Sequence, residues 1–197
     1  MPTNTTCEVT TRLIDVLEDE VDEKYYLSEE KTKKLTLDHL SPTLNTTSEP
    51  KIAVLGNTSH TGYKAHDVHD INGLSPTIAA RDYKGPKQIA VREATKKGYA
   101  IAEQGDSVNV TYPDSKTRRG RVGKGVAQTL QAGEVNQGTV TNDLRIRKLT
   151  PKECFRLQGF TDEQFHKAEE VNSNSQLYKQ AGNSVTVNVI QAIAERL

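Results

Sequence analysis

The last third of this 197-residue chain carries its strongest local structural signals. Residues 144–149 alternate apolar and basic side chains, a pattern typical of a half-buried strand. Thr150 and Glu153 follow with the spacing of a capping box, and Pro151 suits the first position of a helix. Gly159 is placed to end that helix. These signals together predict a strand followed at once by a short capped helix.

A second capping box, formed by Thr161 and Gln164, predicts another short helix. Gly182 then indicates the end of a further helical turn, with Asn183 or Ser184 as the cap of a final helix. That final helix has one apolar face at helical spacing, formed by Val185, Val189, Ile190, Ile193 and Leu197. We expect poor solubility or self-association if no partner covers this face.

The first 143 residues predict helices and then short strands. Residues 10–22 have an amphipathic pattern, and Ser28 is placed to cap a second helix that runs through Leu40. Residues 41–50 are rich in Ser, Thr, Pro and Asn, which is typical of a loop. Three β-branched stretches follow, and they predict a compact, mostly antiparallel sheet: IAVLGN, QIAVRE and SVNVTYP. The fold class is therefore α+β.

The charge is distributed unevenly although the formal net charge is zero. Residues 1–50 contain 5 basic and 11 acidic residues, whereas residues 84–148 contain 13 basic and 6 acidic residues. This asymmetry suggests a basic face for a polyanion. Two cysteines without a secretory signal favour a reducing cytoplasm, and no stretch of 18 apolar residues predicts a membrane span.

Three stretches resemble a known enzyme family. RKLTPKECFRLQGF (147–160) resembles the ninth motif of the cytosine-C5 DNA methyltransferases, and YKQAGNSV (178–185) resembles their tenth. GRVGKGVAQTLQAG (120–133) is similar to a target-recognition stretch of these enzymes and contains their Thr-Leu pair. The resemblance implies methyl transfer from S-adenosylmethionine to C5 of cytosine in a specific sequence of double-stranded DNA.

Three catalytic features of that family are absent from the sequence: the Gly-rich cofactor loop, the Pro-Cys nucleophile and the Glu-Asn-Val segment. Neither Cys7 nor Cys154 follows a proline. We therefore expect no catalytic residue in this chain, which would be inactive alone and would need a partner carrying the N-terminal catalytic half. A truncated chain, one subunit of a split enzyme and a gene remnant all fit this pattern.

The resemblance also divides the chain into three segments. Residues 1–50 would be a helical connector from the catalytic core, and residues 51–143 a β-rich target-recognition region. Residues 144–197 would close back on the catalytic domain, with the C-terminal helix packed on that missing Rossmann-like domain. A short internal echo between residues 72–80 and 124–132 is either a repeat or chance.

The densest basic cluster, KTRRGRVGK, predicts a DNA-binding loop. Arginine side chains suit phosphate oxygens and the O6/N7 edge of guanine, although a solvated basic turn is the alternative for a cluster alone. The resemblance adds the threonine of the Thr-Leu pair, beside the DNA backbone. The predicted DNA-binding residues are Arg118, Arg119, Arg121, Lys124 and Thr129. Gln128 and Gln131 are further candidates for reading adenine.

The family places its tenth motif beside the cofactor loop, so the resemblance implies a cofactor-side role for Asn183, Ser184 and Val185. A helix N-terminus is also a favourable place to meet a polar cofactor. His66 and His69, with His60 nearby, invite a metal site, but they have no cysteine partner and no capped helix to hold them, so we predict a polar loop. Cys154 is interpreted as a small buried apolar residue rather than a nucleophile.

The resulting hypothesis is the recognition half of a cytosine-C5 DNA methyltransferase from restriction-modification or phage DNA protection. The alternatives are a stand-alone sequence-specific DNA-binding module and an inactive remnant. Restoration of activity by an added catalytic half distinguishes the enzyme part from the stand-alone module.

Overall fold

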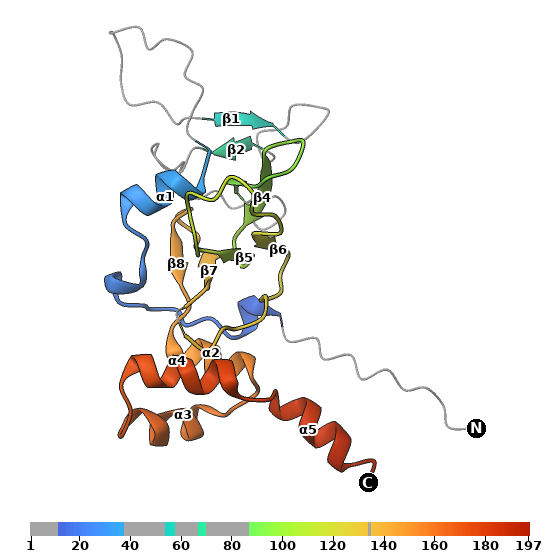
Figure 1. The fold of residues 1–197 in the computed structure, drawn as a ribbon. Coiled ribbons are helices and arrows are strands. Elements are labelled where there is room, and N and C mark those ends of the chain that lie inside the picture. Colours follow the sequence, from blue (N-terminus) through green and yellow to red (C-terminus); the bar gives the residue numbers. More distant parts are fainter. Residues whose placement is uncertain (1–11, 38–53, 58–66, 70–86, 134) are drawn as a thin grey trace, which may run out of the picture.

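The computed structural model describes residues 12–37, 54–57, 67–69, 87–133 and 135–197. Their strands form two four-stranded sheets, and most of their helices lie at the C-terminal end of the chain (Figure 1). This arrangement confirms the α+β class. Among the described residues, no helix is long and apolar enough to cross a bilayer.

The first sheet has the order β1-β2-β3-β4, and only its β2–β3 pair is parallel. Its strands are β1 (Val54–Asn57), β2 (Asp67–His69), β3 (Gln88–Arg92) and β4 (Tyr99–Glu103). The second sheet is antiparallel, with the order β6-β5-β7-β8. Its strands are β5 (Ser107–Asn109), β6 (Val122–Gly123), β7 (Gln137–Val140) and β8 (Ile146–Lys148).

The strands predicted within 52–57, 88–93 and 144–149 are confirmed as β1, β3 and β8, and residues 52 and 53 lie outside the described residues. The third predicted strand, 107–113, is shorter than expected. It ends at Asn109 because the following residues turn away, with Tyr112 in the left-handed region at φ 48°. The prediction of a single sheet was wrong, because the strands are divided between two separate sheets.

Buried apolar side chains form two cores. One lies with the sheets and consists of Leu35, Ile89, Val91, Ala102, Val108, Val110, Val140, Leu144 and Ile146. The other lies among the C-terminal helices and consists of Leu13, Val16, Leu149, Cys154, Phe155, Phe165, Leu177 and Ala181. Residues 12–37 therefore contribute to both cores. The three predicted segment boundaries remain a prediction.

The helices α2 (Pro151–Leu157) and α3 (Asp162–Glu169) begin as the sequence predicts. The Thr150 hydroxyl accepts a hydrogen bond from the backbone N–H of Glu153, and the Glu153 side chain accepts one from the backbone N–H of Thr150. Thr161 and Gln164 make the same reciprocal pair at the start of α3. Gly159 follows α2 in the left-handed conformation at φ 84°, which suits the residue after a helix C-cap. These local rules suffice because each cap uses residues within one turn.

The N-terminal helices differ from expectation. Residues 12–22 form only the 3-10 helix Leu13–Asp15, because the backbone N–H groups of Leu13 and Glu18 donate to Gly125 and to the Glu153 carboxylate instead of to a helix. The helix α1 (Glu29–Leu35) has the predicted Ser28 cap, but it ends five residues early. Thr36 there forms an isolated bridge with Val91, so the chain joins β3. Residues 38–50, including the predicted loop, lie outside the described residues.

The last two helices also shift the predicted boundaries. Helix α4 (Asn174–Asn183) runs through Gly182, so this glycine does not end it. Helix α5 (Val187–Ala194) has Thr186 at its cap position, without a side-chain cap bond, so neither Asn183 nor Ser184 caps it. The predicted apolar residues of this segment are exposed, with relative accessibilities from 43% at Val189 to 104% at Leu197. Figure 1 shows α5 projecting away from the other helices.

Candidate functional site: a nucleic-acid interface

Arg118 and Arg119 lie on the loop between β5 and β6, beside the turn that joins β3 to β4. The Ala94 N–H donates to the Arg118 carbonyl at 2.8 Å, and the Arg119 Nε donates to the Ala94 carbonyl at 2.9 Å. Arg119 is exposed and Arg118 is partly exposed. Both predicted DNA-binding arginines are therefore accessible and held in place by main-chain contacts.

Arg121 is not placed as a surface contact, which corrects its assignment from sequence. The side chain is 0% exposed, and its guanidinium donates to the carbonyls of Asn109, Thr111 and Tyr112 at 2.7–3.2 Å. Burial lowers the pKa of Arg121, and the positive charge of Arg118 acts in the same direction. A guanidinium presents five donors in a rigid fork, so it can bind several carbonyls at once. Arg121 therefore stabilises the loop between β5 and β6 from inside.

Lys124 is accessible but already paired. Its Nζ lies 2.6 Å from Oδ2 of the buried Asp106, while the lysine side chain keeps 58% of its accessibility. Asp106 also accepts the N–H groups of Gly125 and Glu103 at 2.9 Å. Part of the Lys124 charge therefore neutralises a buried carboxylate that organises the loop, which reduces what it can offer to a DNA phosphate.

Thr129 is exposed on the loop after β6, and its carbonyl accepts from the buried Asn136 at 2.9 Å. The adjacent Gln128 is not free to read a base, since its amide donates to the Gly120 carbonyl and accepts from Asn109. Gln131 is exposed. The structure thus leaves Thr129 and Gln131, rather than Gln128, accessible from this segment.

The end of α4 packs against this same loop. A Cβ atom added to Gly182 would lie 2.5 Å from the Gln131 carbonyl oxygen and 2.6 Å from the Ala132 nitrogen. Only a residue without a side chain permits that approach, which explains a glycine inside a helix. The structure therefore brings the two family-like segments, around Thr129 and around Asn183, into direct contact.

We expect Gly182→Ala to lower the free energy of unfolding by about 1–3 kcal/mol, because the new methyl group would collide with backbone atoms that cannot move aside alone. Urea unfolding of the two proteins measures this difference. Gly133→Ala is the matched control, because a Cβ there meets nothing within 4 Å. Equal loss of stability in both variants would contradict the close approach.

The three cofactor-side candidates follow at the end of α4. Asn183 is exposed and Val185 is 60% exposed. The Ser184 hydroxyl donates to the Ala181 carbonyl at 2.8 Å, and its N–H donates to Gln180. Asn183 and Val185 are therefore available to a ligand, whereas the Ser184 hydroxyl stabilises the helix end.

A buried ion pair connects this region, and the sequence alone did not reveal it. Arg147 and Glu153 are 3% and 0% exposed, and their side chains form two hydrogen bonds of 2.6 and 2.8 Å. Glu153 also accepts the N–H groups of Glu18 and Thr150, each at 2.8 Å. Burial alone lowers the pKa of Arg147, but the bonds to Glu153 raise it overall. The capping box was a visible signal for Glu153, whereas Arg147 resembled an ordinary basic strand residue.

Cys154 is buried, as interpreted from the sequence, and burial raises the pKa of its thiol to about 12. A thiolate is the reactive form, so this cysteine is a poor nucleophile. His69 is buried in β2, while His60 and His66 lie outside the described residues. Within the described ranges, no group of three His, Cys, Asp or Glu side chains is suited to a metal.

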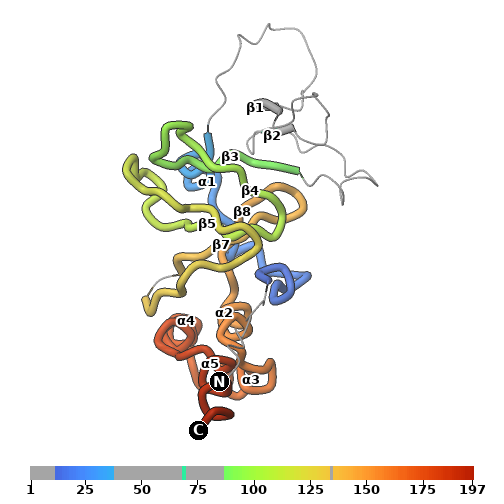
Figure 2. The backbone as a smooth tube through the Cα atoms, turned by 90° about the vertical axis from the view of Figure 1, so that its right-hand side faces the viewer, coloured from blue at the N-terminus to red at the C-terminus, as the bar shows by residue number. Residues whose placement is uncertain are grey.

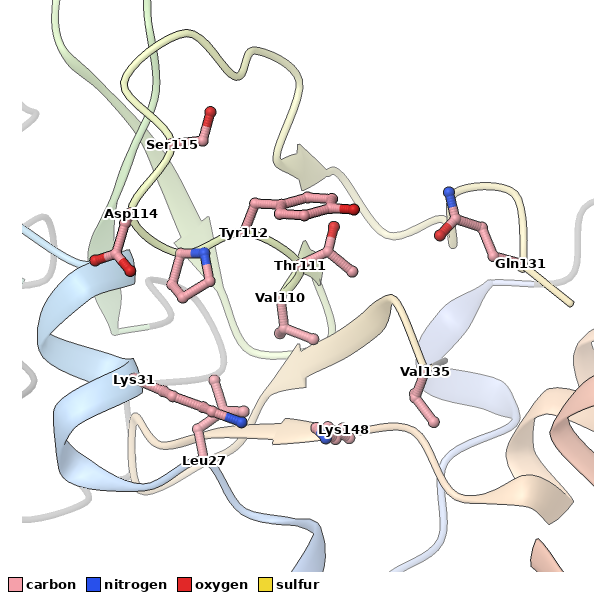
Figure 3. Close-up of a pocket in the computed structure, with 11 residues that line it drawn as sticks. Leu27, Lys31, Val110, Thr111, Tyr112, Asp114, Ser115, Gln131, Val135 and Lys148 are labelled. Carbon is pink, nitrogen blue, oxygen red and sulfur yellow. The ribbon is translucent and has the colours of Figure 1, made fainter. Parts of the chain in front are cut away.

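A hollow of about 900 Å³ lies beside the loop between β5 and β6 (Figure 3). Leu27, Val110 and Val135 contribute apolar surface, and the Lys31 and Lys148 side chains lie on the same side of it. Tyr112 stands above, 73% exposed, and Gln131 lies at the far rim. The hollow is bounded by the loop that Arg121 holds, so the shape of both depends on that buried arginine.

Comparison with known proteins defines the family. The family model for C-5 cytosine-specific DNA methylases matches residues 1–197, so the chain belongs to this family. No solved structure matches the chain.

Several relatives are phage or bacterial methyltransferases. The orphan methyltransferase M.SPBetaI of Bacillus phage SPbeta is 39% identical over 200 residues, which cover 96% of this chain and 42% of that protein. The orphan methyltransferase M.Rho11sI of Bacillus phage rho11s is 40% identical, covering 94% of this chain and 55% of that protein. The type II methyltransferase M.Bsp6I of Bacillus sp. (strain RFL6) is 56% identical over 52 residues, which cover 26% of this chain and 16% of that protein. The chain thus spans about half the length of its long-matching relatives.

Proposed function

We propose that this chain is the target-recognition and C-terminal part of a DNA (cytosine-5-)-methyltransferase. The complete enzyme would transfer a methyl group from S-adenosylmethionine to C5 of cytosine in a specific duplex sequence, in restriction-modification or phage DNA protection. Family membership over the whole chain supports this proposal, as do the phage methyltransferases among the relatives. The observation that carries it is the contact between the Thr-Leu loop and the end of α4.

That contact matters because it joins a DNA-facing segment to a cofactor-facing segment. In the proposed enzyme, the target cytosine leaves the base stack and enters the catalytic half. Arg118, Arg119 and Thr129 would bind the DNA. Lys124 would contribute less, because its ammonium group already pairs with Asp106. Asn183 and Val185 would face the cofactor, which supplies the methyl group when bound, and Ser184 would hold their backbone in place.

The exposed face of α5 supports a second subunit or domain. Val185, Val189, Ile190 and Ile193 are each at least 43% exposed and lie at helical spacing. A contiguous apolar face of this kind favours association. The proposed occupant is the N-terminal catalytic half, which would carry the cofactor loop and the cysteine nucleophile that this sequence lacks. Self-association is the expected behaviour of the chain without that half.

The test is transfer of labelled methyl groups from S-adenosylmethionine to cytosine-containing duplex DNA. We expect no transfer by the chain alone, because it has no Pro-Cys nucleophile. We expect transfer when the chain is mixed with the part of the M.SPBetaI methyltransferase that this chain does not match, since the match covers 42% of that protein. The Cys154→Ala chain is the matched control and should complement equally well, because the thiol is buried.

Three other outcomes would overturn parts of this proposal. Methyl transfer by the chain alone would show that a nucleophile is present. Loss of that chain-alone transfer in a stably folded Cys154→Ala chain would identify the nucleophile as Cys154. Salt-sensitive duplex binding with no transfer in any mixture would favour a stand-alone DNA-binding module.

A further inference from the structure

The turn between β3 and β4 and the loop between β5 and β6 are separate in sequence but adjacent in the fold. Figure 2 shows both at the same edge of the sheets, near α1. The two hydrogen bonds between Ala94 and the Arg118–Arg119 backbone and side chain fix this neighbourhood. The turn itself is closed by the Gly98 N–H, which donates to the Thr95 carbonyl at 3.0 Å. Any charge on the turn is therefore presented together with the charge on the loop.

Both segments are basic. The turn carries Lys96 and Lys97, both exposed, and Lys97 Nζ lies 4.7 Å from the centroid of the Tyr99 ring. The loop carries Lys116, Arg118 and Arg119. Within the described part of the chain, none of these five side chains forms an ion pair with a carboxylate. We call these five residues the turn–loop surface.

The nearest acids are already used. The Glu93 carboxylate accepts the N–H groups of Arg121 and Val122 at 2.6 and 3.3 Å. Asp114 lies 3.6 Å from the Lys34 ammonium. A hollow of about 520 Å³ beside the turn and the loop is also lined by Lys33 and Lys34, but these lysines pair with Glu29 and Glu30 on α1. The positive charge of the turn–loop surface is therefore left for an external partner.

We propose that the turn–loop surface is one continuous binding site for the phosphates of duplex DNA, and that Lys96 and Lys97 are phosphate contacts of the recognition region. This inference rests on the proposed function and extends it to a strand turn that lies outside the family-like segments. Exposed lysines without a carboxylate partner suit phosphate oxygens as flexible point charges, and the arginine forks of the adjacent loop bind the same oxygens. The contacts would position the protein on DNA without reading its sequence.

The test uses the full chain and its Lys96→Ala/Lys97→Ala double variant, with binding to duplex DNA measured between 50 and 200 mM salt. The slope of log affinity against log salt is negative, and each lost phosphate contact reduces its magnitude by about 0.9, so the double variant should have a slope shallower by about 1.8. That difference corresponds to a roughly twelvefold change in the salt effect over this range. The loss should be the same for every duplex sequence, because phosphates carry no sequence information.

The matched control is Lys167→Ala/Lys179→Ala, which removes two exposed lysines from α3 and α4. It should leave the slope unchanged. An unchanged slope in the turn variant, or an equal drop in both double variants, would overturn the turn–loop site while leaving the proposed function in place. If the wild-type chain shows no salt-dependent DNA binding at all, both the site and the proposed function fail. Thermal melting of each variant excludes unfolding as the cause.

Discussion

Replacing Arg147 with methionine is expected to lower the free energy of unfolding by about 3–5 kcal/mol, the usual cost of leaving one member of a buried ion pair without its partner. Glu153 is 0% exposed and would keep its charge in a site from which water is excluded. Its other partners are the Glu18 and Thr150 N–H groups, which are neutral dipoles and do not compensate a full charge. The total free energy of unfolding of a typical domain is only about 5–15 kcal/mol, so this variant should lose a large part of its stability.

Urea unfolding monitored by circular dichroism measures this effect. Glu23→Gln is the matched control, because Glu23 pairs with Arg145 at the surface, with the glutamate side chain 73% exposed. Surface pairs contribute about 0–1 kcal/mol, so the control should change little. The Arg147→Met/Glu153→Gln double variant should recover part of the loss, because a neutral amide leaves no unpaired buried charge and its oxygen still accepts a hydrogen bond from the Glu18 or Thr150 N–H group. A loss below about 1 kcal/mol for Arg147→Met would show that the pair is not buried in solution.

The position of this pair explains why its loss should spread. Arg147 belongs to β8 and Glu153 to α2, and Glu153 also binds the chain near Glu18. The pair therefore holds the sheet, the helical core and the N-terminal segment at one point. Its removal should disturb the docking of the second sheet on the helices, in addition to lowering stability.

The sequence predicted those parts of the fold whose causes are local. The capping boxes at Thr150 and Thr161 each use residues three apart, and both helices begin where expected. The helix predicted over residues 10–22 is reduced to a 3-10 turn at Leu13–Asp15 for the opposite reason. Their apolar spacing suits a helix, but Leu13 and Glu18 donate their N–H groups to Gly125 and Glu153, more than one hundred residues away. No local pattern contains those partners.

The candidate site shows the same division. Arg118, Arg119 and Thr129 are accessible because they lie on loops. The Gly, Thr and charged residues around them predict those loops from the sequence. The sequence does not distinguish Arg121 from Arg119, two residues earlier, because burial depends on how β5 and β6 pair. Gly182 was likewise predicted to end a helix. The structure shows instead that a glycine is needed there because the backbone of Gln131 lies too close for a side chain.

Arg121→Met is the second variant with a large expected effect, a loss of about 3 kcal/mol or more in the free energy of unfolding. The methionine fills much of the same space, but the carbonyls of Asn109, Thr111 and Tyr112 lose their common donor. A buried polar group without a partner costs about 1–3 kcal/mol, and bonds from a charged donor are at the strong end. The left-handed conformation of Tyr112, at φ 48°, would then lose the bond that holds its carbonyl.

Two measurements separate this structural role from the DNA contact that the sequence suggested. Urea unfolding should show the large loss for Arg121→Met and a small one for Arg119→Met, whose side chain is exposed and binds a single carbonyl. Duplex binding should show the reverse for a direct contact, with Arg119→Met weakening affinity at unchanged stability. If Arg121→Met keeps wild-type stability and loses DNA affinity, Arg121 is a surface contact after all. Arg121→Lys should fall between wild type and methionine, because one ammonium cannot reach three carbonyls with the geometry of a guanidinium.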